Sequence, residues 1–361
     1  MIDIPVRSTS ATEALQASTA RAFRLPRLAT PISICLLLAA LLLAVSFGSS
    51  DISFRAIVTD LVDAIPGISV DSGLTDSQRS ILWQWRAPRA VLGALVGSSL
   101  ALGGATYQGV FRNPLADPYL LGVAAGAVLV PLWPSSRGLI TAGVRSIRFA
   151  RRFIGGLVAI AASAGVGFGV SRGPAALLLA GVAVASFLTA AQTYVMQRNT
   201  DILAEVYSWI LGRLGTFGWT EVTLLLPYFV VCSGIILLLR RQLDVLQLGD
   251  DEAVALGVPV LRVRIILILA ASLLAAAAVA VSGLISFVGI IVPHVVRLLV
   301  GSNYRTVLPM SAIGGATFLV LADVGARNLT GGAELPIGVV TAFFGAPFFA
   351  FVMWSRRGSF G

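Results

Sequence analysis

The feature that most restricts the fold of this chain is a succession of about ten apolar segments, each close to the length that a helix needs to cross a bilayer. A water-soluble protein of this size needs more surface charge, but only 12% of the 361 residues are charged and 57% are hydrophobic. Transmembrane β-strands are about half as long as these runs. We therefore predict an all-α polytopic membrane protein with ten transmembrane helices. We place them at Pro31–Gly48, Arg86–Tyr107, Tyr119–Pro134, Phe153–Val170, Ala175–Met196, Val222–Leu239, Arg262–Ser282, Gly283–Val300, Thr306–Gly325 and Leu335–Phe351.

Small residues are frequent within these segments, as in the pairs Gly103-Gly104 and Gly314-Gly315. In lipid, helices gain little from hydrophobicity and associate instead through small residues that let their backbones approach closely. The composition therefore predicts a tightly packed bundle.

The arginines set the expected orientation, because cytoplasmic loops carry an excess of basic residues. Residues 1–30 hold four arginines and two more follow the last segment, so we expect both termini to be cytoplasmic. Residues 1–30 are predicted to be a poorly ordered tail, and residues 31–357 a single transmembrane domain. In such a protein the net charge of +9 reflects topology and does not indicate a nucleic-acid partner.

One basic stretch departs from that rule. Five arginines between Arg137 and Arg152 fall between the third and fourth segments, on the predicted outer side. Two explanations are open. In the first, a segment boundary is misplaced or the loop has no role. In the second, the outer face is basic because its charge serves a function. In the last case its positive potential would steer an anionic cargo or an acidic partner.

Several kinds of site are excluded by residue types. All 26 basic residues are arginine, so the chain has no P-loop lysine and no Schiff-base lysine. One histidine (His294) and two cysteines (Cys35 and Cys232) cannot build a His/Cys metal cage, so no metal site is predicted. His294 follows a proline inside an apolar segment, and we expect it to pack between helices.

Two motifs stand at the ends of the second segment. Arg86-Ala-Pro-Arg89 opens it, as a pair of interface anchors or as a docking point for carboxylates of an outside partner. At the other end, the two prolines of Asn113-Pro-Leu-Ala-Asp-Pro118 must break the helix, giving a plain turn or a gate element.

Two further motifs lie later in the chain. Residues 249–258 combine an acidic first turn with a stop at Gly257 and predict a short capped helix on the inner face. That helix is an ordinary surface element or a lever on which a cytosolic machine acts. Asp323 and Arg327 are four residues apart on one helix face and predict an ion pair near the outer end.

These motifs, in this order, resemble those of the FecCD-type permease family of iron–siderophore and vitamin B12 transporters, over about residues 80–355. The matching residues are Arg86 and Arg89, Gln108 to Pro118, Leu121-Gly122, Leu177 to Val182, Leu248 to Gly257, Phe287 to His294, Ala322 to Arg327, Glu334 to Gly338 and Gly345 to Pro347.

The resemblance implies the membrane subunit of a type II ABC importer in a bacterial cytoplasmic membrane. Such a permease pairs with a second permease subunit, identical or related, and binds two cytosolic ATPases. A substrate-binding protein delivers its cargo from outside. The chain would not be an enzyme and would need no cofactor, since the ATPase binds ATP and magnesium.

The resemblance also implies residue roles where the motifs match. The docking residues for the binding protein would be Arg86, Arg89 and Arg327, and the cytoplasmic gate residues Asn113 and Leu115. The helix that couples to the ATPase would contain Asp250, Asp251, Glu252, Ala253, Ala255, Leu256 and Gly257. A second gate position is not assigned, because residues 173–175 are Gly-Pro-Ala where the B12 permease has hydroxyl residues.

The cargo is ranked by the commonest use of the family, with ferric siderophore first, cobalamin second and haem third. Two functions of other classes are an ion-coupled secondary transporter and an intramembrane enzyme. The acidic residues cluster at segment ends, and the segments hold no His pair and no Ser/Lys dyad. Both functions are therefore disfavoured.

Overall fold

The computed structural model describes residues 28–48, 52–63, 70–132, 145–170, 174–329 and 334–355. A helix occupies each of the ten predicted segments, so the all-helical prediction is confirmed. These helices are α2 (Ala29–Ser46), α5 (Ala87–Val110), α6 (Val123–Leu132), α8 (Arg145–Val170), α9 (Pro174–Gln197), α11 (Thr220–Leu238), α14 (Val260–Ser282), α15 (Val288–Val300), α16 (Tyr304–Asn328) and α17 (Ile337–Ser355).

Seven helices among the described residues are long and apolar enough to cross a membrane. They are α2, the continuous stretch Asp76–Val110, α8, α9, α11, α14 and α16. Two further apolar helices, α15 and the stretch Ile337–Ala350 of α17, are shorter, and α6 is described over ten residues. The predicted tail of residues 1–30 lies almost wholly outside the described residues, which begin at Leu28.

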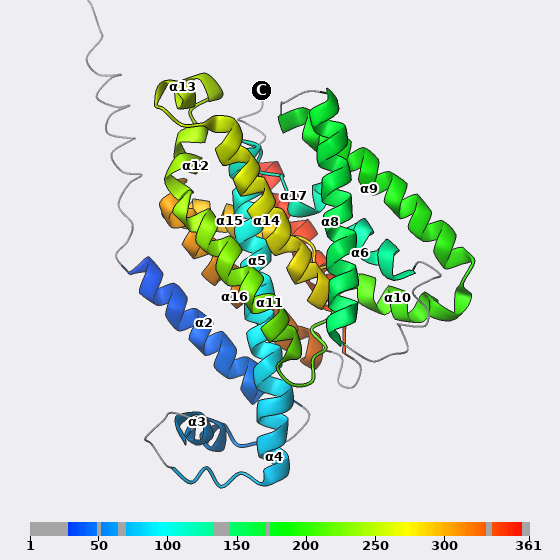
Figure 1. The fold of residues 1–361 in the computed structure, drawn as a ribbon. Coiled ribbons are helices and arrows are strands. Elements are labelled where there is room, and N and C mark those ends of the chain that lie inside the picture. Colours follow the sequence, from blue (N-terminus) through cyan, green and yellow to red (C-terminus); the bar gives the residue numbers. More distant parts are fainter. Residues whose placement is uncertain are drawn as a thin grey trace, which may run out of the picture.

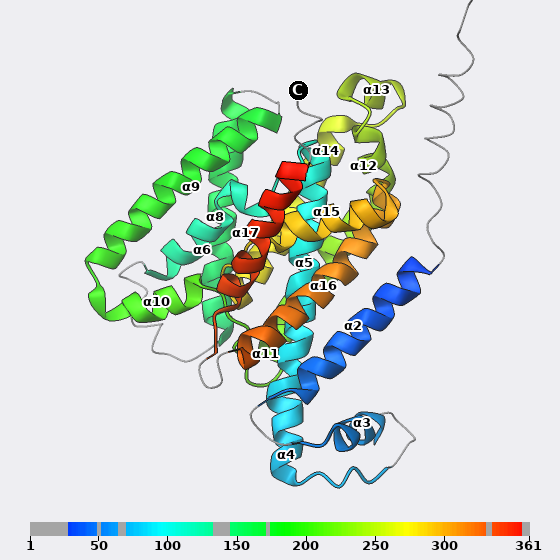
Figure 2. The ribbon, with the colours of Figure 1, turned by 180° about the vertical axis from the view of Figure 1, so that it is seen from behind.

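Helix α5 runs through the middle of the bundle (Figure 1) and packs against α11, α14, α15 and α16. Helices α6, α8 and α9 form a group on one side, joined to the rest where α8 packs on α14. Helix α2 lies on the opposite side against α16, as the reverse view shows (Figure 2).

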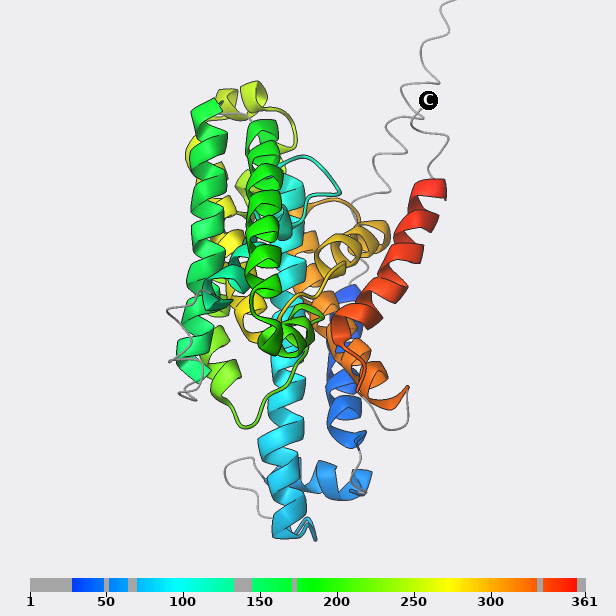
Figure 3. The ribbon, with the colours of Figure 1, turned by 90° about the vertical axis from the view of Figure 1, so that its right-hand side faces the viewer.

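Additional short elements lie at the two ends of the bundle. At one end, α3 (Phe54–Asp63) and α4 (Asp76–Ile81) project beyond the other helices (Figure 3). At the opposite end lie α12 (Arg240–Leu246) and α13 (Asp250–Ala255). The described residues also contain helix α10 (Leu203–Ile210) and three one-turn elements, η2 (Leu82–Arg86), η3 (Pro118–Leu121) and η5 (Thr200–Ile202).

Glycines allow α5 to approach its neighbours at backbone distance. A Cβ added to Gly97 would overlap the backbone of Gly315 in α16, and one added to Gly104 would overlap the backbone of Gly289 in α15. Any larger residue would push the helices apart. The predicted close packing is confirmed, and it explains why α5 is buried along most of its length.

Three predicted helix starts were wrong by five residues or more. The second span begins ten residues earlier, at Asp76, because α4 and η2 continue into α5. The fourth begins at Arg145, because its basic first turns are helical even though they are not apolar. The eighth begins at Val288, because positive φ angles at Gly283 (71°) and Phe287 (70°) break the helix between them.

The non-helical backbone around residues 211–215 and 283–287 is paired within the protein. The N–H of Arg213 donates to the carbonyl of Ser282 at 2.8 Å, and the N–H of Ile337 donates to the carbonyl of Gly212 at 3.1 Å. Irregular backbone is tolerated at membrane depth only when protein satisfies its polar groups. These bonds fix the position of Arg213 and of the end of α10.

We predict that Gly104→Ala destabilises the fold, because its methyl group would enter the backbone of α15. Overpacking of this kind costs about 1–3 kcal/mol. The matched control is Gly165→Ala in α8, whose Cβ would meet nothing within 4 Å. In detergent-solubilised protein, thermal unfolding should occur at a lower temperature in Gly104→Ala and at an unchanged or higher one in Gly165→Ala. Equal melting temperatures for the two variants would contradict the packing described.

Candidate functional site

The end of the bundle that carries Arg86, Arg89 and Arg327 is named here the arginine end. Helices α4, η2 and α5 form one continuous rod that enters this end. The π-helical turn Leu82–Arg86 precedes Pro88, which lies in the first turn of α5 and has no N–H to donate. The rod therefore continues through the proline and presents both arginines from a buried helix.

Arg86 binds the end of another helix. Its Nη1 donates to the carbonyls of Val45 and Ser46, both at 3.0 Å, at the C-terminus of α2. The last carbonyls of a helix have no partner within it, and a cation there is favoured by the helix dipole. Arg86 is only 6% exposed, so in this conformation it stabilises the protein's own fold.

Arg89 binds two carboxylates. Its Nη2 lies 2.9 Å from Oδ1 of Asp323 in α16, and its Nη1 lies 3.0 Å from Oε1 of Glu334. The Asp323 side chain is 2% exposed, whereas that of Glu334 is 61% exposed. The hydrogen bond from Arg89 lowers the pKa of Glu334 below its ordinary value, against the opposing effect of partial burial. The carboxylate therefore stays ionised at neutral pH.

Arg327 completes this network. Its Nε lies 3.1 Å from Oδ2 of Asp323, which confirms the predicted pair. Its guanidinium also donates to the carbonyls of Phe47 and Ala44. The buried Asp323 thus holds two arginines, and a buried carboxylate needs such partners.

The three arginines line one pocket of about 850 Å³ at this end of the molecule. Two more arginines, Arg145 and Arg213, line the same pocket, and Glu334 is the one acid among its described lining residues. The predicted docking residues therefore do lie together, in a strongly positive recess. Their docking role stays a prediction.

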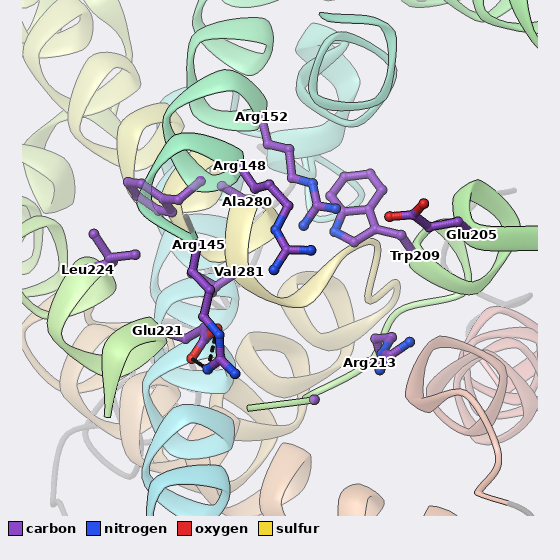
Figure 4. A pocket seen from close by; sticks show the side chains of 12 residues that line it. Arg145, Arg148, Arg152, Glu205, Trp209, Arg213, Glu221, Leu224, Ala280 and Val281 are labelled. Carbon is purple, nitrogen blue, oxygen red and sulfur yellow. Dashed lines mark hydrogen bonds and ion pairs between the residues drawn. The ribbon is translucent and has the colours of Figure 1, made fainter. Parts of the chain in front are cut away.

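The basic stretch between Arg137 and Arg152 belongs largely to a helix. Arg137 lies outside the described residues, but Arg145, Arg148, Arg151 and Arg152 occupy the first turns of α8. Because Arg145 lines the pocket that contains Arg86, this cluster lies at the arginine end. Arg145, Arg148 and Arg152 also line a neighbouring cavity (Figure 4).

The opposite end carries the predicted short helix. Helix α13 spans Asp250–Ala255 after Gly249, whose φ of 139° only glycine adopts readily. It ends at Ala255, and Gly257, which follows with a φ of 79°, donates its N–H to the carbonyl of Val254. The predicted short helix is present but shorter than residues 249–258, and its coupling role stays a prediction.

The faces of α13 differ in exposure. Asp251, Glu252, Ala255 and Leu256 are exposed, together with Val254, which the sequence motif did not single out. Ala253, which the sequence placed in this helix, is fully buried against the chain's own core. Its small side chain lets α13 lie close to the bundle, and the coupling role of the helix stays a prediction.

The predicted gate residues form a tight turn after α5. Arg112 has a φ of 48°, which ends the helix. The Oδ1 of Asn113 then accepts the N–H of Leu115 at 2.9 Å, an Asx turn that fixes the loop. Leu115 itself is 46% exposed at the surface. The motif is thus a defined projection at the end of α5 opposite the arginine end, and its gating role stays a prediction.

This turn, named here the gate turn (residues 112–115), is joined to α13 by an ion triad. Oδ1 of Asp250 lies 2.9 Å from Nη2 of Arg112 and 2.9 Å from Nη2 of Arg264 in α14. The hydrogen bond from Arg264 lowers the pKa of Asp250, with partial burial opposing and the charges of Arg264 and Arg112 contributing. The triad is therefore present at neutral pH and is lost only as the pH falls through that lowered pKa.

Sequence reasoning missed this triad and the carbonyl partners of Arg86. Arg112 and Asp250 are far apart in sequence, so no local spacing could pair them. The one available signal was chemical: arginines so close to the core of a membrane protein require acceptors, and acids are few.

Comparison with known proteins places this geometry in a family. Residues 36–355 match the FecCD transport family. The cobalamin import system permease protein BtuC of Halobacterium salinarum is 40% identical over 289 residues, covering 79% of this chain and 76% of the relative. The iron(3+)-hydroxamate import system permease protein FhuB of Bacillus subtilis is 35% identical over 333 residues, covering 90% of this chain and 82% of the relative.

A solved structure described as an inward-facing conformation of a putative metal-chelate type ABC transporter has the same fold. It aligns with a TM-score of 0.78 at 28% identity and covers 92% of this chain and all of that one. The expected type II importer fold is thereby confirmed. The chain belongs to the FecCD transport family and is the non-catalytic permease subunit of an ABC importer, which acts in the cell membrane with a partner ATPase and a binding protein.

Proposed function

We propose that this permease imports an iron chelate, with ferric siderophore as the first candidate and cobalamin or haem as alternatives. In this proposal a substrate-binding protein delivers the chelate at the arginine end. Two such permease chains, identical or related, form the pathway, and two cytosolic ATPases drive it. The family membership leaves no role for the secondary-transport or enzymatic functions considered from sequence.

The observation that carries the proposal is the arrangement at the two ends of α5. One end presents the positive pocket, and the other bears the gate turn, salt-bridged to α13. A single buried helix thus connects a surface suited to an acidic partner with one suited to a cytosolic partner. A change at α13 can reach the gate turn through the Asp250 triad.

The proposed orientation puts the arginine end outside and α13 in the cytoplasm of a bacterial cell. The α2 start and the α17 end, which point away from the arginine end, would then both be cytoplasmic (Figure 2). The first residues of the chain and its last ones are rich in arginine, in agreement with that placement.

The test of the cargo is uptake by the reconstituted complex. Proteoliposomes that contain the permease and its ATPase, supplied with the binding protein, should accumulate a ferric siderophore only when ATP is present inside. Cobalamin and haem are tested in parallel. Accumulation of cobalamin or haem alone would replace the first candidate. Accumulation driven by an ion gradient without ATP would contradict the proposal as a whole.

We predict that Glu334→Gln strengthens docking of the binding protein. Glu334 competes with any incoming carboxylate for Arg89, and it is exposed enough to be replaced without loss of core packing. The dissociation constant should fall several-fold at low salt, and the gain should shrink as salt screens the exposed charges. Surface plasmon resonance on the complex in nanodiscs measures this change.

The control is Arg79→Gln, which alters an arginine of α4 at the same end that does not line the pocket and pairs with Asp60 and Asp63. Its docking affinity should match that of the unaltered protein. An unchanged or lower affinity in Glu334→Gln would show that the pocket arginines do not receive carboxylates of the binding protein.

We predict that Asp250→Asn uncouples ATP hydrolysis from uptake, because it removes the charge that joins Arg112 to Arg264. The control is Asp201→Asn, since Asp201 lies in η5 outside α13, is exposed, and has no ion pair among the described residues. The number of ATP molecules hydrolysed per cargo molecule should rise at least several-fold in Asp250→Asn and stay constant in Asp201→Asn. Equal ratios in both variants would refute a coupling role for the triad.

A further inference from the structure

The arginines at the start of α8 face a second cavity, which shares Arg145 and Arg213 with the pocket at the arginine end. Arg145, Arg148 and Arg152 follow one another at spacings of three and four residues, so they share one face of the helix. They line a cavity of about 280 Å³ (Figure 4), together with Glu205 and Trp209 of α10, Arg213, and Glu221 of α11.

The charges around this cavity do not balance. Four of its lining residues are arginines and two are acids, an excess of two positive charges (4 − 2). Glu221 is already engaged, because it lies 3.2 Å from Nη1 of Arg145 and also accepts the hydroxyl of Thr216. In the described part of the chain no acid lies within ion-pair distance of Arg148. The positive charge of Arg148 also repels that of Arg152.

A second observation points to a missing acceptor. Trp209 is 8% exposed, and its Nε1–H has no hydrogen-bond partner among the described residues. The guanidinium of Arg152 lies 4.6 Å from the centre of the indole ring. Figure 4 shows the nitrogen edge of the ring turned toward the side from which Arg148 and Arg152 enter. A buried N–H without an acceptor is costly, so a group with oxygen atoms is expected there.

We propose that this cavity binds the phosphate group of an anionic ligand, held by Arg148, Arg152 and the indole N–H of Trp209. A phosphate group carries one negative charge in a lipid phosphodiester and up to two in free phosphate or a monoester, so it offsets half or all of the excess. A phosphate group also offers more acceptor oxygens than a carboxylate, so it can accept hydrogen bonds from all of these donors. Planar guanidinium groups bind phosphate in bidentate fashion. The proposal does not depend on which cargo the permease carries.

The phosphate has two sources, a lipid headgroup or a soluble phosphate compound. Phe149, Leu224, Ala280 and Val281 give the cavity an apolar wall at the ends of α8, α11 and α14, as a lipid headgroup site requires. Bound anionic lipid would also offset the tendency of these arginines to stay in the cytoplasm. Both sources share one phosphate chemistry, and the experiment distinguishes them.

The test measures ligand binding to the purified full-length chain in a neutral maltoside detergent. The probes are inorganic phosphate and dioleoyl phosphatidylglycerol, with neutral diacylglycerol as the reference lipid. Dissociation constants come from native mass spectrometry for the lipids and from calorimetry for phosphate. Stronger binding of phosphatidylglycerol than of diacylglycerol, without binding of inorganic phosphate, identifies a lipid headgroup. Binding of inorganic phosphate identifies a soluble source.

Three variants assign the binding to this cavity. Arg148→Gln should weaken binding about tenfold, because it removes one charged bidentate donor. Trp209→Phe keeps the ring but removes the N–H, and should weaken binding about threefold to tenfold. Arg151→Gln makes the same charge change on the same helix outside the cavity lining, and should leave binding unchanged. Absence of binding by both probes, or an equal loss in Arg148→Gln and Arg151→Gln, would overturn the proposal.

Discussion

Direct backbone contact between α5 and its neighbours is the constraint on which the rest of the structure depends. Because Gly97 and Gly104 have no side chain, α15 and α16 lie against the backbone of α5 itself. A helix packed this closely on several sides cannot bend or shift alone. Whatever is attached to its two ends is therefore held at a fixed separation, and any displacement of one end carries the other.

Because α5 is rigid, the interactions at its two ends are mechanically linked. At the arginine end, Arg86 and Arg89 anchor α5 to α2 and α16 through buried carbonyls and the carboxylate of Asp323. At the opposite end, Arg112 joins the gate turn to Asp250 of α13. In the proposed transport cycle the first network stays intact as a structural anchor, while the second transmits the position of the ATPase to the gate turn.

The sequence predicted the elements that depend on local chemistry. Apolar segments located the helices, and Gly249 and Gly257 predicted a short helix between them. The spacing of Asp323 and Arg327 predicted their ion pair. The order of the motifs also identified the family. Interactions between distant segments could not be predicted, because nothing in the local pattern pairs Arg112 with Asp250 or directs Arg86 to the end of α2.

Errors in the boundaries had a common physical cause. Hydropathy locates apolar residues, but a helix needs only hydrogen bonds and allowed backbone angles. The arginines at the start of α8 are therefore helical without being apolar, and residues 283–287 are apolar without being helical. The burial of Ala253 could not be predicted either, since a small side chain suits a buried contact within the chain as well as contact with a partner.

The most direct test of the account measures the distance between the gate turn and α13 in the assembled importer. Spin labels are attached to cysteines that replace Leu115 and Ala255, both of which are exposed. Pulsed electron–electron double resonance then gives the distance between the two labels without nucleotide and with trapped ATP. The account predicts one narrow distance distribution that is the same in both states, because the Asp250 triad moves as a unit. A shifted or broadened distribution with ATP would contradict it, since the gate turn and α13 would then move independently.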